Sequence, residues 1–186
     1  MQKIVLASAS PRRREILELA GISFEVCPAK EEYAPKGLSP ADTAVALAKS
    51  KCEAVFRQFP DRVVVGADTI VVLDDRILGK PHSDREAVEM LMSLQGRTHT
   101  VITGVWVCSS GKSGGFADES RVTFHPMTEE EALEYVRTGE PNDKAGAYAI
   151  QGLGMRFVKE LSGDFYSVMG LPGGRLRRYL ASFPEF

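Results

Sequence analysis

Two periodicities of hydrophobic and polar residues run through the chain. Apolar residues at helical spacing predict helices that begin at a capping Ser or Thr, as at Ser39, which is followed by Pro40. β-branched runs bounded by Gly, Pro and Asp predict strands. The predicted helices cover residues 11–20, 40–59, 83–94, 128–137 and 174–183, and the predicted strands cover residues 3–7, 63–65, 70–73, 77–78, 98–108, 120–124, 147–150, 157–161 and 165–169. Because the two kinds of element are interleaved, we expect an α/β fold with a mixed twisted sheet and flanking helices.

Length and composition are those of an ordinary soluble protein. The 186 residues are 44% hydrophobic and 26% charged, which is enough to bury a sizeable core. We expect a single domain over residues 1–186, with two lobes around a central cleft. No stretch approaches the roughly 18 apolar residues of a membrane-spanning helix, so we expect no membrane partner.

Charge and cysteine content indicate which partners and which cellular compartment suit the protein. The formal net charge is −2, so the overall charge attracts neither nucleic acid nor an anionic membrane, and any recognition of phosphate must be local. Cys27, Cys52 and Cys108 are odd in number and far apart in sequence, which fits a reducing cytosol better than disulfides or zinc. The apolar segment at the amino terminus is too short for a secretion signal, so we expect a cytoplasmic protein.

The sequence matches neither a P-loop nor a zinc-binding motif. Gly111-Lys112-Ser113 resembles the end of a P-loop, but Trp106 occupies the place of the required first glycine. His82, His99 and His125 do not have a zinc-binding spacing. We therefore expect neither a P-loop nor a preformed zinc site.

The turn between the first predicted strand and helix is a candidate phosphate site. Ser8, Ser10, Arg12 and Arg13 lie in it. A helix N-terminus carries partial positive charge, so cations in its first turn are unfavourable by roughly 0.3–1 kcal/mol each. Hydroxyls, free N–H groups and guanidinium groups at one turn are typical of a site that binds phosphates. The alternative is that the arginines extend into water or pair with nearby glutamates.

Asp68 interrupts an apolar strand pattern. It follows Gly66 and Ala67 and precedes Thr69, between two β-branched runs. A carboxylate in such a run is unfavourable unless it is paired, hydrogen-bonded or bound to a metal. The position suits metal binding or general-base catalysis, and the small neighbours leave room for a ligand. The alternative is a structural Asp that caps a turn at a strand break.

Further charged and polar residues are weaker candidates by themselves. Lys51 flanks the apolar stripe of the second predicted helix, where a snorkelling lysine is the ordinary interpretation. Lys80 precedes a proline, and Glu32 lies in a loop where solvated carboxylates are usual. Residues 143–152 combine a charged pair, small residues and Gln151, an amide that can donate and accept at a base edge. The alternative for this segment is a bend in the sheet.

Taken in order, these segments resemble the Maf family of nucleotide pyrophosphatases. The resemblance covers nearly the whole chain and rests on several short segments in register. They are Ser8-Ala9-Ser10-Pro11-Arg12-Arg13, Lys51, Gly66-Ala67-Asp68-Thr69, Gly79-Lys80-Pro81, residues 143–152, Gly163-Asp164 and Val168-Met169-Gly170-Leu171-Pro172. The resemblance implies an α/β fold of two lobes around a cleft, like that of the inosine triphosphate pyrophosphatases.

The resemblance also implies a reaction. A nucleoside triphosphate is hydrolysed between its α- and β-phosphates, with magnesium, manganese or cobalt as the divalent ion. Asp68 matches the proposed proton acceptor that activates water, and Glu32 and Asp68 match metal ligands. Lys51 and Lys80 match catalytic residues of the phosphate and metal site, to which Arg13 also belongs.

Residues at three positions distinguish substrate branches of the family. Arg12, Thr69 and Gln151 together resemble the branch that acts on dTTP and UTP, with CTP and modified pyrimidine nucleotides as further candidates. The branch that acts on 7-methyl-GTP has Trp, Gln and Glu at these three positions.

The sequence departs from the family pattern at Gly173-Gly174, where relatives have bulkier residues, and we expect this departure to loosen the last helix. A homodimer is compatible with the resemblance.

Two other functions stay open at this point. A nucleotide-binding regulator of septum formation needs only affinity, whereas an enzyme needs Asp68, Lys51 and Lys80 around one phosphate chain. A phosphatase that releases single phosphates would differ in its products. The role of Asp68, as general base or as metal ligand, is also open.

Overall fold

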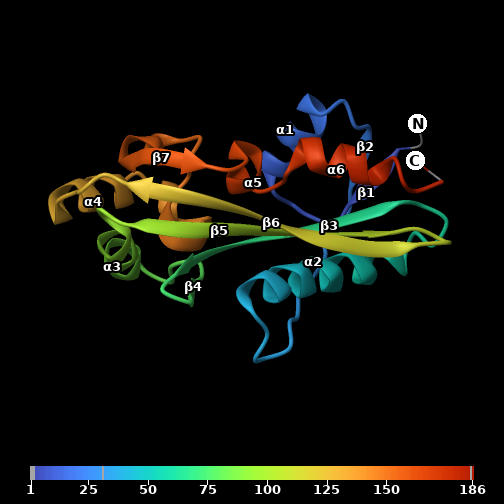
Figure 1. The fold of residues 1–186 in the computed structure, drawn as a ribbon, viewed down its shortest axis with the longest axis horizontal. Coiled ribbons are helices and arrows are strands. Elements are labelled where there is room, and N and C mark those ends of the chain that lie inside the picture. The colour runs from blue at the N-terminus through green and yellow to red at the C-terminus, as the bar shows by residue number, and fades with distance from the viewer. Residues whose placement is uncertain (1–2, 31, 185) are drawn as a thin grey trace. The chain divides into compact units, whose positions relative to one another are not determined.

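The computed structural model describes residues 3–30, 32–184 and 186. Its elements form an α/β fold around a mixed sheet of seven strands with flanking helices, as the sequence predicts (Figure 1). Glu31, next to the predicted ligand Glu32, lies outside the described residues. No helix in the described part of the chain has the length and the apolar character that crossing a membrane requires.

Strands and helices alternate along the chain. The strands are β1 (Ile4–Leu6), β2 (Phe24–Val26), β3 (Val64–Leu73), β4 (Arg76–Leu78), β5 (Thr98–Cys108), β6 (Ser113–Phe124) and β7 (Val158–Ser162). The helices are α1 (Pro11–Leu19), α2 (Pro40–Phe56), α3 (Asp84–Leu94), α4 (Glu129–Val136), the 3-10 helices η1 (Glu140–Asp143), η2 (Ala145–Ala147) and η3 (Leu153–Phe157), α5 (Phe165–Met169) and α6 (Gly173–Leu180). The strands pair in the order β2-β1-β3-β5-β6-β7, with β4 on β3. β1 is parallel to β2 and β3, whereas β4 and β7 are antiparallel to their partners.

The chain divides into two compact units, each built from separate stretches of sequence. The first unit holds Met1–Thr69, Thr103–Asp118 and Gly170–Phe186, and the second holds Ile70–Ile102 and Glu119–Met169. β3, β5 and β6 each contribute residues to both units. Two units agree with the expected two lobes, whereas the cleft and the single domain over the whole chain stay predictions.

In the first unit, α2 packs on the sheet at backbone distance. A Cβ added at Gly66 of β3 would lie 2.3 Å from the carbonyl oxygen of Ala48, and one added at Gly104 of β5 would lie 2.2 Å from that of Ala44. Neither position has room for a side chain, so the glycines permit this close approach. α1 and α6 cover the opposite face of the same strands (Figure 1).

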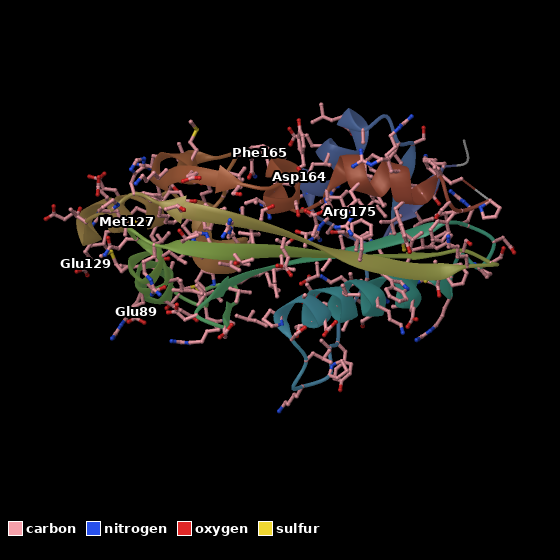
Figure 2. The ribbon with its side chains drawn as sticks, in the orientation of Figure 1. Glu89, Met127, Glu129, Asp164, Phe165 and Arg175 are labelled. Carbon is pink, nitrogen blue, oxygen red and sulfur yellow. The ribbon has the colours of Figure 1, made fainter. Side chains whose placement is uncertain are left out.

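α6 is fixed within the first unit by a glycine and an arginine. A Cβ at Gly173 would lie 2.7 Å from Cγ2 of Ile16 on α1, so the missing side chain lets α6 approach α1. Arg175 donates hydrogen bonds to the carbonyl oxygen of Ala117 at 2.8 Å and to Asp118 Oδ2 at 2.9 Å on β6 (Figure 2). Gly173 therefore has a packing role, and the expected loosening of the last helix at Gly173-Gly174 stays a prediction.

Most predicted elements are confirmed, and three of the helices begin at the expected caps. Ser39, Ser83 and Thr128 each accept a hydrogen bond from a backbone N–H in the first turn of α2, α3 and α4. α2 ends at Phe56 rather than at residue 59, and β6 begins at Ser113 rather than at residue 120. β2 has no counterpart in the prediction, because its three residues carry too short a pattern.

The predicted strand over residues 147–150 is wrong. Gly146 and Ala147 have positive φ angles of 67° and 59°, which turn the backbone instead of extending it. The amide of Gly146 donates to the carbonyl oxygen of Gly79 at 3.1 Å. The amide of Ala147 donates locally to the carbonyl oxygen of Lys144 at 3.1 Å, so these backbone groups are paired without a sheet, and the apolar composition does not make a strand.

The predicted strand over residues 165–169 is also wrong, because these residues form α5. Asp164 begins the helical turn. Its side chain accepts a hydrogen bond from the amide of Tyr166 at 2.8 Å, and its carbonyl oxygen accepts one from the amide of Val168 at 3.1 Å. Local side-chain capping thus overrides the β propensity of the aromatic residues.

Replacing Gly66 with Ala tests the close approach of α2. The added methyl group would meet the backbone of α2, so we expect the free energy of unfolding to fall by about 1–3 kcal/mol, as in an overpacked core. Gly174→Ala is the matched control, because Gly174 is exposed on α6 and a Cβ there has nothing within 4 Å. Urea unfolding followed by circular dichroism measures both. A Gly66→Ala protein as stable as the wild type would show that α2 moves away at no cost.

Candidate functional site

Asp68 lies within β3, in a largely apolar part of the sheet. Ala67 beside it is fully buried, and the side chain of Asp68 is 14% exposed. Lys51 on α2 donates a hydrogen bond to Asp68 Oδ1 at 2.6 Å. Because β3 continues through Asp68, the alternative of a turn cap at a strand break is wrong. An ammonium group thus compensates the carboxylate, as the burial of a charge requires.

Lys51 faces the sheet because of the way α2 packs. The next residue, Cys52, is fully buried and donates from its Sγ to the carbonyl oxygen of Val64 at 3.2 Å. Lys51 is 16% exposed and forms a second ion pair, with Glu32. It is therefore no snorkelling surface lysine, and one ammonium joins two carboxylates that lie far apart in the sequence.

Glu32 and Asp68 are the two carboxylates of this cluster that could hold a divalent cation. Mg²⁺ is usually bound through one or two protein carboxylates together with substrate phosphates. Both carboxylates already converge on the ammonium of Lys51, so their oxygens can also meet a cation placed beside it. No group of three or more His, Cys, Asp or Glu residues that could hold a metal occurs among the residues described.

Arg13 is a second buried charge in the first unit, with 9% of the residue exposed. Its Nη1 donates to Ser8 Oγ at 2.9 Å, and its Nε donates to the carbonyl oxygen of Gly170 at 2.9 Å. Its Nη2 donates to Thr69 Oγ1 at 3.4 Å. Burial lowers the pKa of the guanidinium group, and the charge of Asp68 acts against this and raises the pKa. The alternative of an arginine extended into water is therefore wrong for Arg13.

The turn before α1 is arranged differently from a capped helix start. Ser10 occupies the N-cap position, but its side chain makes no capping hydrogen bond. Its amide instead donates to Ser8 Oγ at 3.2 Å. The first turn of α1 contains no acidic residue, and Arg12 in that turn is half-buried. The N–H groups at this helix start are thus left without a side-chain cap, which suits the binding of phosphate oxygens.

Two further residues belong to this cluster and were not singled out from the sequence. Thr103 of β5 is fully buried, and its Oγ1 lies 2.9 Å from Thr69 Oγ1. Gly170 has a φ angle of 134°, and its carbonyl oxygen faces Arg13. The segment around Gly170 is part of the family resemblance, but only the fold reveals this carbonyl contact. No sequence pattern distinguishes Thr103 from other strand residues.

Lys80 and Gln151 belong to the second unit, and both are exposed. Within this unit, the segment that carries Lys80 contacts the segment of residues 143–152 that carries Gln151. The amide of Gly146 donates to the carbonyl oxygen of Gly79, the residue before Lys80. The predicted contacts of Lys80 and Gln151 with a substrate stay predictions.

Comparison with known proteins points to one family. The family model described as Maf-like protein matches residues 3–183. A dTTP/UTP pyrophosphatase of Bacillus cereus (strain AH820) is 50% identical over 184 residues, which are 98% of this chain and 96% of that protein. Proteins of the same name from Bacillus thuringiensis subsp. konkukian (strain 97-27) and Bacillus anthracis are also 50% identical, with the same coverage.

A solved structure with a weaker likeness is that of the Ham1 protein of Staphylococcus aureus. It covers 84% of this chain and 80% of its own, with 13% identity and a TM-score of 0.48. A likeness of this degree does not establish a common fold. The expected relation to the inosine triphosphate pyrophosphatases therefore stays a prediction.

Arg13→Lys tests whether the arginine organises this cluster. Lysine keeps the charge, but its single ammonium cannot reach the three acceptors that the guanidinium group serves. We expect the free energy of unfolding to fall by about 1–3 kcal/mol, because buried acceptors lose their donors. Arg14→Lys is the control, since Arg14 is exposed and donates to the carbonyl oxygen of Ala9. Equal urea midpoints for the two variants would contradict the organising role.

Proposed function

The chain belongs to the Maf family, and we propose that it is a nucleotide diphosphatase that hydrolyses dTTP and UTP to the monophosphate and pyrophosphate. The observation that carries this proposal is the carboxylate of Asp68 inside an apolar strand. Lys51 holds its Oδ1, and Oδ2 accepts no hydrogen bond from the residues that the structure describes. A carboxylate fixed in this way, with one oxygen available, suits a group that takes a proton from water.

The charge of the substrate accounts for the cations of the first unit. A nucleoside triphosphate carries about four negative charges, and the pyrophosphate that leaves keeps most of them. We assign the phosphate chain to the uncapped start of α1, with Ser8, Ser10 and Arg12 as its ligands. Arg13 holds this turn in place through Ser8 and adds its positive charge. The family resemblance adds Lys80 to the phosphate ligands.

Asp68 acts as the general base in this proposal. Its Oδ2 accepts a proton from a water molecule while the water oxygen attacks the α-phosphorus. The bond between the α-phosphorus and the bridging oxygen then breaks, and pyrophosphate leaves. Lys51 keeps the carboxylate in one orientation through Oδ1. The partial exposure of Asp68, 14% of its side chain, gives the proton a route to solvent.

Glu32 and Asp68 are the residues that would hold a divalent cation. Magnesium, manganese or cobalt, when bound, would supply positive charge that stabilises the leaving pyrophosphate. The side chain of Glu32 is 50% exposed, so it can turn from Lys51 toward an incoming substrate. Asp68 is held more firmly, which suits its assignment as the base.

Gln151 selects the base of the nucleotide in this proposal. Its amide group can donate and accept at the same time, so it can pair with the edge of thymine or uracil. Thr69 has a different part. Its hydroxyl faces Thr103 and accepts a hydrogen bond from Arg13, so it helps to hold the guanidinium group of Arg13 in place. CTP and modified pyrimidine nucleotides are further candidate substrates.

We also place the enzyme in the cytoplasm. Its three cysteines are free thiols, which suits a reducing compartment. A homodimer stays a prediction.

A product assay tests the proposed function. The purified protein is incubated with magnesium and with each of dTTP, UTP, CTP, GTP and 7-methyl-GTP, and the products are separated by chromatography. Monophosphate plus pyrophosphate from dTTP and UTP is the expected result. Diphosphate plus phosphate would indicate a phosphatase. Binding without turnover under magnesium, manganese or cobalt would favour a nucleotide-binding regulator of septum formation.

Asp68→Asn removes the base and keeps the shape of the side chain. We expect kcat for dTTP to fall by at least about a hundredfold, because the amide does not accept the proton. Calorimetry should still detect dTTP binding, and circular dichroism should be unchanged. Asp61→Asn, at an exposed carboxylate shortly before β3, is the matched control with full turnover. Substantial remaining activity would remove Asp68 from the role of base, and lost binding would favour the regulator.

A further inference from the structure

Glu140, the first residue of η1, is the centre of a hydrogen-bond network in the second unit. Tyr135 on α4 donates from its Oη to Glu140 Oε2 at 2.6 Å. The backbone amides of Leu153 and Gly154 donate to Oε1 and Oε2, each at 3.0 Å. One carboxylate therefore accepts three hydrogen bonds, and two of them come from the backbone just after Gln151.

Tyr135 holds the backbone on the other side of Gln151. Its hydroxyl accepts a hydrogen bond from the amide of Ala149 at 3.1 Å while it donates to Glu140. The residue is fully buried, and its ring lies edge-on to Phe157 with 5.2 Å between centroids. Packing therefore fixes the position of this hydroxyl. Gln151 lies between two backbone segments that are both tied to the same pair of side chains.

Gly152 allows the loop to close onto the carboxylate. A Cβ at Gly152 would lie 2.0 Å from Glu140 Oε1, a separation that two non-bonded atoms do not have. The residue directly after Gln151 must therefore lack a side chain if Glu140 is to reach the amides beyond it. The close approach and the hydrogen bonds are separate indications that the loop is built around Glu140.

The network favours the charged form of Glu140. Partial burial raises the pKa of this carboxyl, but the hydrogen bonds from Tyr135, Leu153 and Gly154 outweigh that effect, so the pKa lies below its ordinary value. Burial and the contact with Glu140 raise the pKa of Tyr135, so its hydroxyl stays a donor. Hydrogen bonds to a charged acceptor are stronger than those between neutral groups. Glu140 therefore holds the loop more firmly than a neutral side chain would.

We propose that Glu140 is a positioning residue for substrate selectivity, which fixes the backbone around Gln151 and thereby the place where its amide meets the base. This inference rests on the proposed function, in which Gln151 contacts the base. Thymine presents a carbonyl acceptor where cytosine presents an amino donor. An amide group whose backbone can shift along the base can pair with either one. A fixed backbone limits the atoms of the base that the amide reaches, and selectivity requires this limit.

Glu140→Gln and Tyr135→Phe test this role. The Gln side chain keeps the shape of Glu140 but has one acceptor oxygen in place of two, so at least one loop amide loses its partner. The Phe side chain keeps the buried ring and lacks the hydroxyl, so the amide of Ala149 loses its partner. Glu134→Gln is the matched control, because Glu134 is an exposed carboxylate on α4, the helix that carries Tyr135.

The first measurement does not depend on activity. Amide hydrogen exchange should become at least about tenfold faster at one or both of Leu153 and Gly154 in Glu140→Gln, and exchange at Ala149 should become faster in Tyr135→Phe. The Glu134→Gln protein should exchange like the wild type. Unchanged exchange in Glu140→Gln would overturn the inference.

The second measurement is the ratio of kcat/KM for dTTP to kcat/KM for dCTP. We expect this ratio to fall roughly fivefold or more in Glu140→Gln, with a larger change in KM for dTTP than in kcat. The same substitution should change the ratio little in a protein that already carries Gln151→Ala, because Glu140 acts through Gln151. An equal effect in both backgrounds would overturn the inference.

Failure of this inference differs from failure of the proposed function. If the wild-type protein does not hydrolyse dTTP, the function fails and the inference fails with it. If the wild-type protein prefers dTTP, and Glu140→Gln changes the exchange but leaves the ratio unchanged, Glu140 supports the fold alone. The function then stands and the inference is overturned.

Discussion

A carboxylate inside an apolar strand needs a partner, and the fold provides one through the close approach of α2 to β3. Lys51 reaches Asp68 because its helix lies at backbone distance from the sheet. Gly66, two residues before Asp68, is what permits that distance. The same short stretch of strand therefore supplies both the charge and the space for its counter-charge. The rest of the site depends on this pairing, because an unpaired carboxylate at this depth would be strongly destabilising.

At the start of α1 the buried charge is positive, and the guanidinium group of Arg13 needs groups that compensate it. Arg13 is compensated by the hydroxyls of Ser8 and Thr69, by the carbonyl oxygen of Gly170 and by the nearby charge of Asp68. All of these groups belong to the first unit. The protein itself thus orients the charged groups, and in the proposed function little reorganisation has to accompany substrate binding. Preorganised charges of this kind are the usual source of electrostatic catalysis.

Much of this arrangement could be predicted from the sequence, and the failures have physical causes. The capped helices carry their own start signals, and Asp68 stood out because its charge contradicts its apolar surroundings. The inward direction of Lys51 did not follow from its position on an amphipathic helix, because only the packing of α2 reveals it. Thr103 lacks any local signal. The segment around Ala147 has the composition of a strand, but Gly146 and Ala147 have positive φ angles and the amide of Gly146 donates to the distant Gly79, which no local pattern indicates.

The network around Gln151 has a consequence for how members of such a family diverge. The network of Tyr135, Glu140, Ala149, Leu153 and Gly154 lies within one continuous stretch of the second unit, whereas Asp68, Lys51 and Arg13 belong to the first. Substitutions in that stretch can alter the loop while the residues that carry the paired charges stay the same. In the proposed function, recognition of the base and cleavage of the phosphate chain are therefore free to evolve at different rates. A change of substrate would then leave the proposed hydrolytic residues as they are.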